Sequence, residues 1–201
     1  MKKSAFTMLE LVFVIVVAGI MAAVMIPRLD RNNVEEAALQ VTRHLRYAQH
    51  LAMSDDVYNH TVANWYSAMW KLSFRSNNCY IVTSNTDLNS NADRNESAID
   101  PLNGNFLYAN TSCTKNAQDN EDLLLADKFG IDSITMTGGC GPIGTSGLIA
   151  FDNLGRPHNN LASATGFMTA PCTITLASGT KEAYIVVEPE TGYVHIPTFN
   201  F

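Results

Sequence analysis

An apolar stretch near the N-terminus constrains the fold of this 201-residue chain more than any other feature. It runs from Phe6 to Ile26, follows the basic pair Lys2 and Lys3, and contains a single charged residue, Glu10. As an α-helix, the 21-residue stretch would measure about 31 Å, which matches the roughly 30 Å hydrocarbon core of a bilayer. Because both lysines precede it, we expect one membrane span with a cytoplasmic N-terminus and the remaining chain outside.

Glu10 distinguishes this stretch from an ordinary export signal. A cleaved signal peptide has an acid-free apolar region of roughly 7–15 residues and a small-residue cleavage site, which only Ala22-Ala23 approximates here. A carboxylate at the centre of a membrane helix costs about 2.5–3.5 kcal/mol, and less near an end, so we expect it to have a partner. We therefore favour a retained helix, with a signal peptide and a plain membrane anchor as alternatives.

The segment Lys3-Ser4-Ala5-Phe6-Thr7-Met8-Leu9-Glu10-Leu11 resembles the class III signal of type IV pilins and type II secretion pseudopilins. The resemblance implies that a prepilin peptidase cuts between Ala5 and Phe6 and then N-methylates Phe6. Members of the family usually carry Gly before the cut, where this chain has Ala5. Pro27 matches the proline that commonly ends the first apolar stretch, and it predicts a kink because proline lacks an N–H and clashes with the preceding turn.

The resemblance also gives Glu10 a role in assembly. Cleavage would expose a new α-amine on Phe6 at the membrane boundary. A neighbouring subunit could pair that amine with Glu10, which would replace a lone carboxylate by a hydrogen-bonded ion pair and fix the register between subunits.

We expect the helix to continue past Pro27 to about Met53. Apolar residues recur there at alternating spacings of four and three, which predicts one buried face: Val34, Ala38, Val41, Leu45, Ala48 and Ala52. The polar positions predict a solvated or subunit-facing side: Glu35, Glu36, Arg43, Arg46 and Gln49. Ser54-Asp55-Asp56 is typical of a helix end.

The rest of the chain is rich in strand signals. We expect strands at 68–74, 79–83, 123–126, 133–136, 147–151, 172–176, 183–187 and 193–196. We expect a long surface loop with short ordered pieces at 85–120. The predicted fold class is α+β, with a long N-terminal helix packed on a small antiparallel sheet. The expected segments are a leader (1–5), a membrane or filament-core helix (6–26), an amphipathic half-helix (27–53) and a β-rich domain (54–201).

The C-terminal third carries a narrower resemblance. Leu148-Ile-Ala-Phe-Asp-Asn-Leu-Gly-Arg-Pro157 and Thr191-Gly-Tyr-Val-His-Ile196 are similar to the closing pattern of H-type pseudopilins and their pilus counterparts, the GspH/FimT group. Relatives often carry Arg after the Gly of the last hairpin, whereas this chain has Tyr193. That departure argues against DNA binding.

Four cysteines follow the apolar stretch: Cys79, Cys113, Cys140 and Cys172. In an exported protein they predict two disulfides, with three possible connectivities. Sequential pairing closes loops of moderate length, so we favour Cys79–Cys113 and Cys140–Cys172.

Charge and motif content narrow the function classes. The net charge is −6, and basic residues cluster only at Arg28–Arg31 and Arg43–Arg46, which argues against a nucleic-acid surface. Five scattered histidines form no catalytic motif, so we expect surface or interface positions and no enzyme: His44, His50, His60, His158 and His195.

One loop has the alternating oxygen ligands of a calcium site, namely Asp87, Asn89, Asn91 and Asp93. An EF-hand would place Gly at Ala92 and Glu at Ala98, and no flanking helices are predicted. We therefore favour a solvated polar loop, with calcium binding as the alternative, and expect no other cofactor.

The expected function is that of a minor pilin-like structural subunit, at or near the tip of a type II secretion pseudopilus or a type IV pilus. The resemblance implies these partners: prepilin peptidase, other pilin or pseudopilin subunits, the inner membrane and the assembly platform. It places the chain as a single-pass inner-membrane protein with a periplasmic C-terminal domain. The alternative is an adhesive or DNA-uptake pilin that acts as a binding module.

Overall fold

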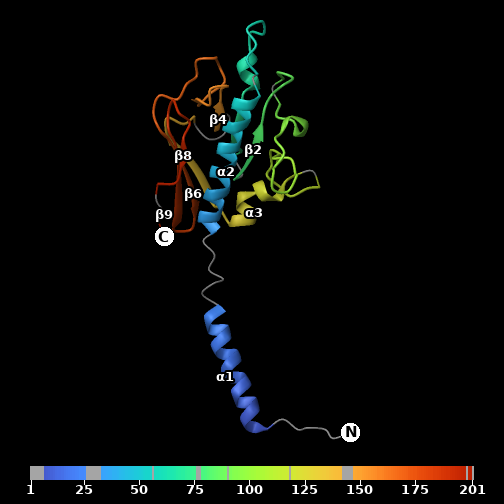
Figure 1. Ribbon diagram of the computed structural model, residues 1–201, viewed down its shortest axis with the longest axis vertical. Helices are drawn as coiled ribbons and strands as arrows, with labels where there is room; N and C mark the ends of the chain where they lie inside the picture. The colour runs from blue at the N-terminus through green and yellow to red at the C-terminus, as the bar shows by residue number, and fades with distance from the viewer. Residues whose placement is uncertain are drawn as a thin grey trace. The chain divides into compact units, whose positions relative to one another are not determined.

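The protein is described here by a computed structural model that covers residues 7–25, 33–55, 57–75, 78–89, 91–117, 119–141, 147–197 and 199–200. The chain divides into two units, Met1–Asn32 and Asn33–Phe201. The first unit contains the helix α1 (Met8–Met25), and the second contains the helix α2 (Asn33–Ser54) and every described strand (Figure 1). The predicted cleavage site at Ala5 and Phe6 and the predicted kink at Pro27 lie outside the described residues.

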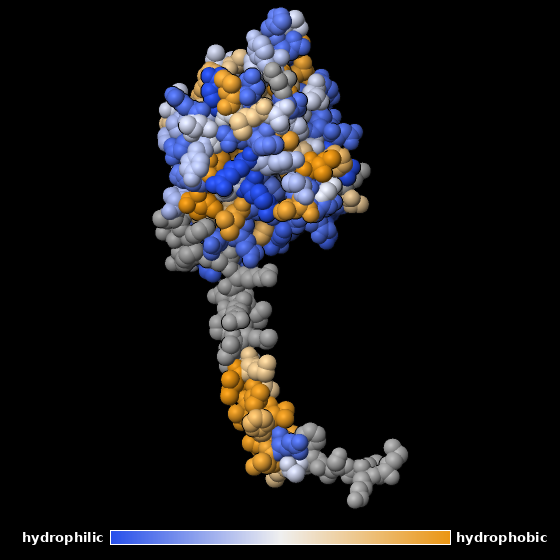
Figure 2. Space-filling view, viewed as in Figure 1, coloured by the Kyte–Doolittle hydropathy of each residue, from blue (hydrophilic) through white to orange (hydrophobic). Residues whose placement is uncertain are grey.

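Helix α1 begins with a side-chain cap. The Glu10 N–H donates to the Thr7 hydroxyl at 3.3 Å and to the Thr7 carbonyl at 3.1 Å. Thr followed three residues later by Glu is the sequence of a capping box, so local chemistry fixes where α1 starts. Its described side chains form a hydrophobic surface with a hydrophilic patch near the start (Figure 2). Within the described residues, no helix combines the length and the apolarity that crossing a membrane requires.

Helix α2 carries the amphipathic pattern expected from the sequence. All six residues of the predicted apolar stripe are buried, and the helix ends at Ser54, where the Ser-Asp-Asp signal predicted its end. It contacts strands of both sheets, so its apolar face is central to the core of the second unit (Figure 1). Ala at three of the six stripe positions lets strand side chains approach the helix backbone closely.

The first sheet is antiparallel, with the strand order β2-β1-β4-β5. Its strands are β1 (Trp70–Arg75), β2 (Cys79–Thr83), β4 (Leu148–Phe151) and β5 (Pro157–His158). Strand β2 is buried at all five positions. Its outer side is covered by the segment predicted as a surface loop: the Val82 N–H donates to the Leu107 carbonyl, and the Ala98 N–H to the Val82 carbonyl. Ala98 and Leu107 are both buried, so the surface-loop prediction for 85–120 is wrong in this part.

The second sheet is also antiparallel, with the order β3-β6-β7-β8, and β9 pairs with β7. Its strands are β3 (Ser133–Gly138), β6 (Cys172–Ser178), β7 (Lys181–Val187), β8 (Val194–His195) and β9 (Phe199–Asn200). Strands β6 and β7 bury alternate residues, as expected for a sheet with one face on the core.

Three sequence expectations are corrected by the second unit. The segment 123–126, expected as a strand, forms the end of a 3-10 turn and the start of the short helix α3 (Leu125–Phe129). His44 and His158, expected at surface or interface positions, are buried within this chain, at 1% and 0% exposure. Gln49, assigned to a solvated or subunit-facing side, is half-buried, and its amide bonds to backbone carbonyls of this same chain. Arg46 is exposed, as that assignment expected, although its guanidinium donates to the Val194 carbonyl.

The two disulfides join Cys79 to Cys113 and Cys140 to Cys172, which is the sequential pairing that the spacing favoured. The first links β2 to the segment that covers it. The second links Cys140, just after β3 ends at Gly138, to Cys172, the first residue of β6 and the pairing partner of Gly138.

Candidate functional site

Glu10, the residue with the sharpest functional prediction, lies exposed in the first turn of α1. A carboxylate at this position is favoured by the partial positive charge of a helix N-terminus, typically by 0.3–1 kcal/mol. This interaction with the helix N-terminus gives the Glu10 carboxylate a local role that is independent of any partner. Because Phe6 lies outside the described residues, the proposed pairing between Glu10 and a Phe6 amine stays a prediction.

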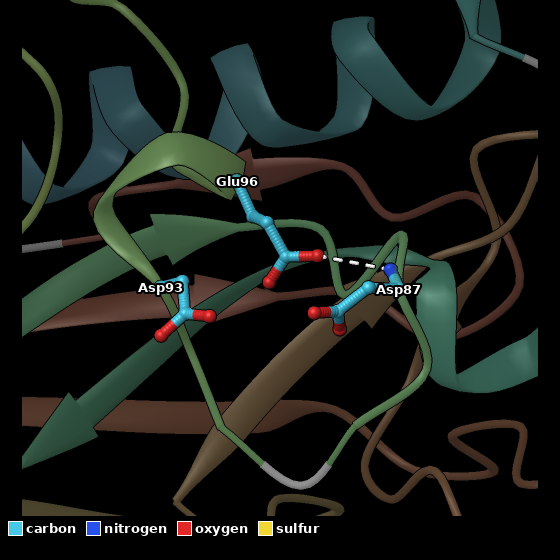
Figure 3. A group of neighbouring side chains, drawn as sticks. All are labelled: Asp87, Asp93 and Glu96. Carbon is cyan, nitrogen blue, oxygen red and sulfur yellow. Dashed lines mark hydrogen bonds between the residues drawn. The ribbon is translucent and has the colours of Figure 1, made fainter.

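A group of three carboxylates forms a candidate cation site in the loop after β2. Asp87, Asp93 and Glu96 each offer an oxygen within 4.8 Å of the others, and their side chains converge in Figure 3. Glu96 comes from the short 3-10 turn Arg94–Glu96. One of its carboxylate oxygens accepts hydrogen bonds from the Asp87 N–H at 3.0 Å and from the Thr86 hydroxyl at 2.9 Å.

The predicted calcium ligands are only partly brought together. Asp87 and Asp93 converge, whereas Asn89 and Asn91 form hydrogen bonds within the loop. The side-chain amide nitrogen of Asn89 donates to the Asp87 carboxylate at 2.5 Å. The side-chain oxygen of Asn89 accepts from the Asn91 backbone N–H at 2.5 Å. Glu96 completes the group instead. Sequence reasoning missed it because a calcium-loop template places the glutamate at residue 98, which is Ala.

Hydrogen bonds to the Glu96 carboxylate favour its ionised form. Burial acts to raise the pKa of Glu96, but the bonds from Asp87 and Thr86 outweigh it and hold the pKa below its usual value. Three hard oxygen ligands could hold a divalent cation, although calcium takes 6–8 oxygens and would need water for the remainder. In this structure the ionised Glu96 carboxylate accepts hydrogen bonds from Asp87 and Thr86 of its own loop.

A second cluster is buried between α2 and β2. The Tyr80 hydroxyl lies 2.7 Å from His44 Nδ1 and accepts a hydrogen bond from the Gln40 amide at 2.8 Å. Because Gln40 donates to the Tyr80 oxygen, the hydroxyl proton is available to His44. Burial raises the pKa of Tyr80 and lowers that of His44 from 6.5 to about 4, while Asp100 opposes the second shift in part. This cluster therefore contains a neutral imidazole.

The two C-terminal motifs meet at α2. The Gln49 amide donates to the carbonyls of Gly155 and Thr191, each at 2.9 Å, and Arg46 donates twice to the Val194 carbonyl. Gly192 has a φ of +64°, and a Cβ there would lie 2.5 Å from the Gly155 oxygen, so only glycine fits.

The Asp-x-x-Gly-Arg-Pro phrase is a folded turn in its own right. The Asp152 carboxylate accepts from the backbone N–H groups of Leu154 and Arg156 and from the Arg156 guanidinium at 2.8 Å. Arg156 also lies over the Phe167 ring, 4.5 Å from its centroid. These contacts give both motifs a packing role that needs no ligand.

Comparison with known proteins does not assign the chain to a family. No protein-family model, no curated protein and no solved structure matches the chain.

Proposed function

We propose that the protein is a minor pilin-like structural subunit. In this proposal a prepilin peptidase removes residues 1–5, N-methylates Phe6, and leaves α1 first in the inner membrane and then in the core of a filament. The observation that carries it is the order of the first 26 residues: a basic leader, Phe6, and an apolar helix with one carboxylate, Glu10, in its first turn.

The contrast between the two helices supports this role. Helix α2 buries one face on its own domain, whereas the described large side chains of α1 are exposed on all sides and almost all apolar. A helix that is hydrophobic all round is stable where its whole surface is covered. A bilayer covers it before assembly, and the α1 helices of other subunits cover it in a filament.

The first experiment tests processing. Native protein would be purified from membranes and its N-terminus determined by Edman degradation and mass spectrometry. We expect N-methylated Phe6 as the first residue. A mature chain that begins at Met1, or one cut near Ala22-Ala23, would refute the proposal.

The second experiment separates the charge of Glu10 from its capping role. The observed cap uses the Glu10 backbone N–H, so Glu10→Gln keeps it and removes the charge, including its interaction of about 0.3–1 kcal/mol with the helix N-terminus. Thr7→Val is the matched control, since it removes the cap and keeps the carboxylate. We expect Glu10→Gln to insert into membranes and to be processed, but to assemble into filaments much less than the parent.

Crosslinking and sheared-filament yield would measure assembly in both variants. Equal losses in Thr7→Val and Glu10→Gln would indicate that helix capping, and not the ion pair, is what assembly requires. Normal assembly of Glu10→Gln would remove the ion-pair mechanism altogether.

A further inference from the structure

A polar cavity lies in the segment that covers β2, apart from the residues used in the proposed function. It measures about 280 Å³, close to the lower end of the range for small-molecule sites, roughly 300–1,000 Å³. Its lining combines acids, amides, one arginine and one aromatic ring. The amides are Asn105 and Asn120, and the acids are Asp119, Glu121 and Asp122.

Asn120 is the residue that points to a ligand. It is 5% exposed, and its side-chain oxygen accepts from the Asp122 N–H at 3.1 Å, which caps the 3-10 turn Glu121–Leu123. Its amide nitrogen is buried and has no hydrogen-bond partner among the described residues. Leaving a buried donor unsatisfied is unfavourable, typically by 1–3 kcal/mol, so an acceptor that enters the cavity and reaches this nitrogen would remove that cost.

The three acids do not make the cavity a cation site. Asp119 accepts from the Asn110 backbone and amide, Glu121 pairs with Lys115 at 2.7 Å, and Asp122 pairs with Lys128 at 2.6 Å. Their charges are thus engaged by neighbours, although carboxylate oxygens keep further acceptor sites. The same acids disfavour an anionic ligand.

The apolar part of the lining is small. It consists of Ala117 and Phe106, and the Arg94 guanidinium lies over the Phe106 ring at 4.4 Å from its centroid. Little surface is left for an apolar side chain, so a peptide anchor or a lipid tail would gain little by entering. A ligand must instead match donors and acceptors at close spacing.

We propose that this cavity binds a neutral saccharide. Sugar hydroxyls both donate and accept: one can accept from the Asn120 amide while others donate to the lining carboxylates. No charge is then buried without a partner. The inference does not depend on pilus assembly, and the test below does not require a filament.

The test uses the full chain in a zwitterionic detergent that has no sugar headgroup. Saturation-transfer NMR would be recorded with N-acetylglucosamine, galactose, N,N′-diacetylchitobiose and lactose as neutral probes. Glucosamine and sialic acid serve as the cationic and anionic probes. We expect transfer to ring protons of at least one neutral probe and weaker or no transfer to the charged ones.

The variant Asn120→Ser removes the amide donor and keeps a side chain that caps helical turns well. The matched control is Asn64→Ser, because Asn64 is exposed and begins a 3-10 turn without a side-chain cap bond. We expect Asn120→Ser to weaken saccharide binding about three- to ten-fold, as loss of one hydrogen bond predicts, and Asn64→Ser to leave it unchanged. Near-UV circular dichroism would check that both variants are folded.

Three outcomes would overturn the proposal. The first is no transfer to any neutral probe. The second is transfer that Asn120→Ser does not weaken, which would place the saccharide elsewhere. The third is preferential binding of glucosamine or sialic acid, which would show that the cavity selects charge.

Discussion

Acidification should weaken the second unit through His44, which is buried between α2 and β2. The folded protein holds its imidazole neutral because burial lowers its pKa from 6.5 to about 4. In the unfolded chain the same group takes up a proton below pH 6.5. The unfolded state therefore binds more protons between pH 6.5 and 4, and the free energy of unfolding falls as pH falls through that window.

The size of the effect follows from the two pKa values. Relative to pH 7.5, His44 lowers the free energy of unfolding by about 2 kcal/mol at pH 5.0 and by about 3 kcal/mol in full below pH 4. The nearby charges act in both directions: Asp100 and Asp122 favour the imidazolium, and Arg43 and Lys128 oppose it. Protonation would also place a donor at Nδ1, 2.7 Å from the Tyr80 hydroxyl, whose oxygen already accepts from the Gln40 amide.

Urea unfolding of residues 33–201, followed by tryptophan fluorescence at pH 7.5 and 5.0, would measure this change. That unit contains the whole described hydrophobic core. In His44→Gln the drop in unfolding free energy between the two pH values should be about 2 kcal/mol smaller than in the parent. His50→Gln is the matched control because His50 is exposed on the same helix. Burial also lowers the pKa of His158, but that contribution is common to all three proteins and cancels in the comparison. An equal drop in the parent and in His44→Gln would refute the reasoning.

The disulfides and the acidic loop allow two further predictions. Replacing Cys79 and Cys113 by Ala should lower the free energy of unfolding in urea by about 4 kcal/mol, because their sequence separation is 34. The pair Cys140 and Cys172, with a separation of 32, should give a similar loss, and a loss under about 1 kcal/mol for both would contradict the chain-entropy argument. Glu96→Gln should speed hydrogen exchange at the Asp87 amide, which donates to the Glu96 carboxylate. In the parent, since the pKa of Glu96 is lowered in the folded state, this protection should persist at neutral pH and be lost only as pH falls through that lowered pKa. Unchanged exchange in Glu96→Gln would show that the loop does not depend on this carboxylate.

Much of the fold follows from local sequence patterns. The stripe from Val34 to Ala52 has the period of a helix face, and the alternation in β6 and β7 has the period of a half-buried strand. The strand prediction for Leu123 to Ala126 was wrong because a run of four apolar residues shows neither the period of a strand nor that of a helix. Gly130, in the left-handed conformation after α3, was the available signal for a short helix.

The parts that could not be predicted depend on partners far along the chain. Nothing near Gln49 in the sequence indicates that its amide joins Gly155 to Thr191. Glu96 joins the acidic group because a 3-10 turn brings it back toward Asp87, at a spacing that no metal motif describes. His44 extends the apolar stripe by one position, and its burial depends on the Tyr80 hydroxyl from β2.

For α1, the free energy of apolar burial can be compared with the free-energy cost of burying Glu10. Eleven of the large apolar side chains that the structure describes on α1 are exposed. Covering each would contribute about 1.5–3 kcal/mol, or at least roughly 16 kcal/mol together. On insertion scales a carboxylate at the centre of a membrane helix costs about 2.5–3.5 kcal/mol, and Glu10 lies near an end, where the cost is lower. Apolar burial therefore dominates, and the carboxylate can neither prevent nor drive the covering of α1. It can only favour those arrangements in which a cation lies beside it, which is why Glu10→Gln should spare membrane insertion and impair assembly.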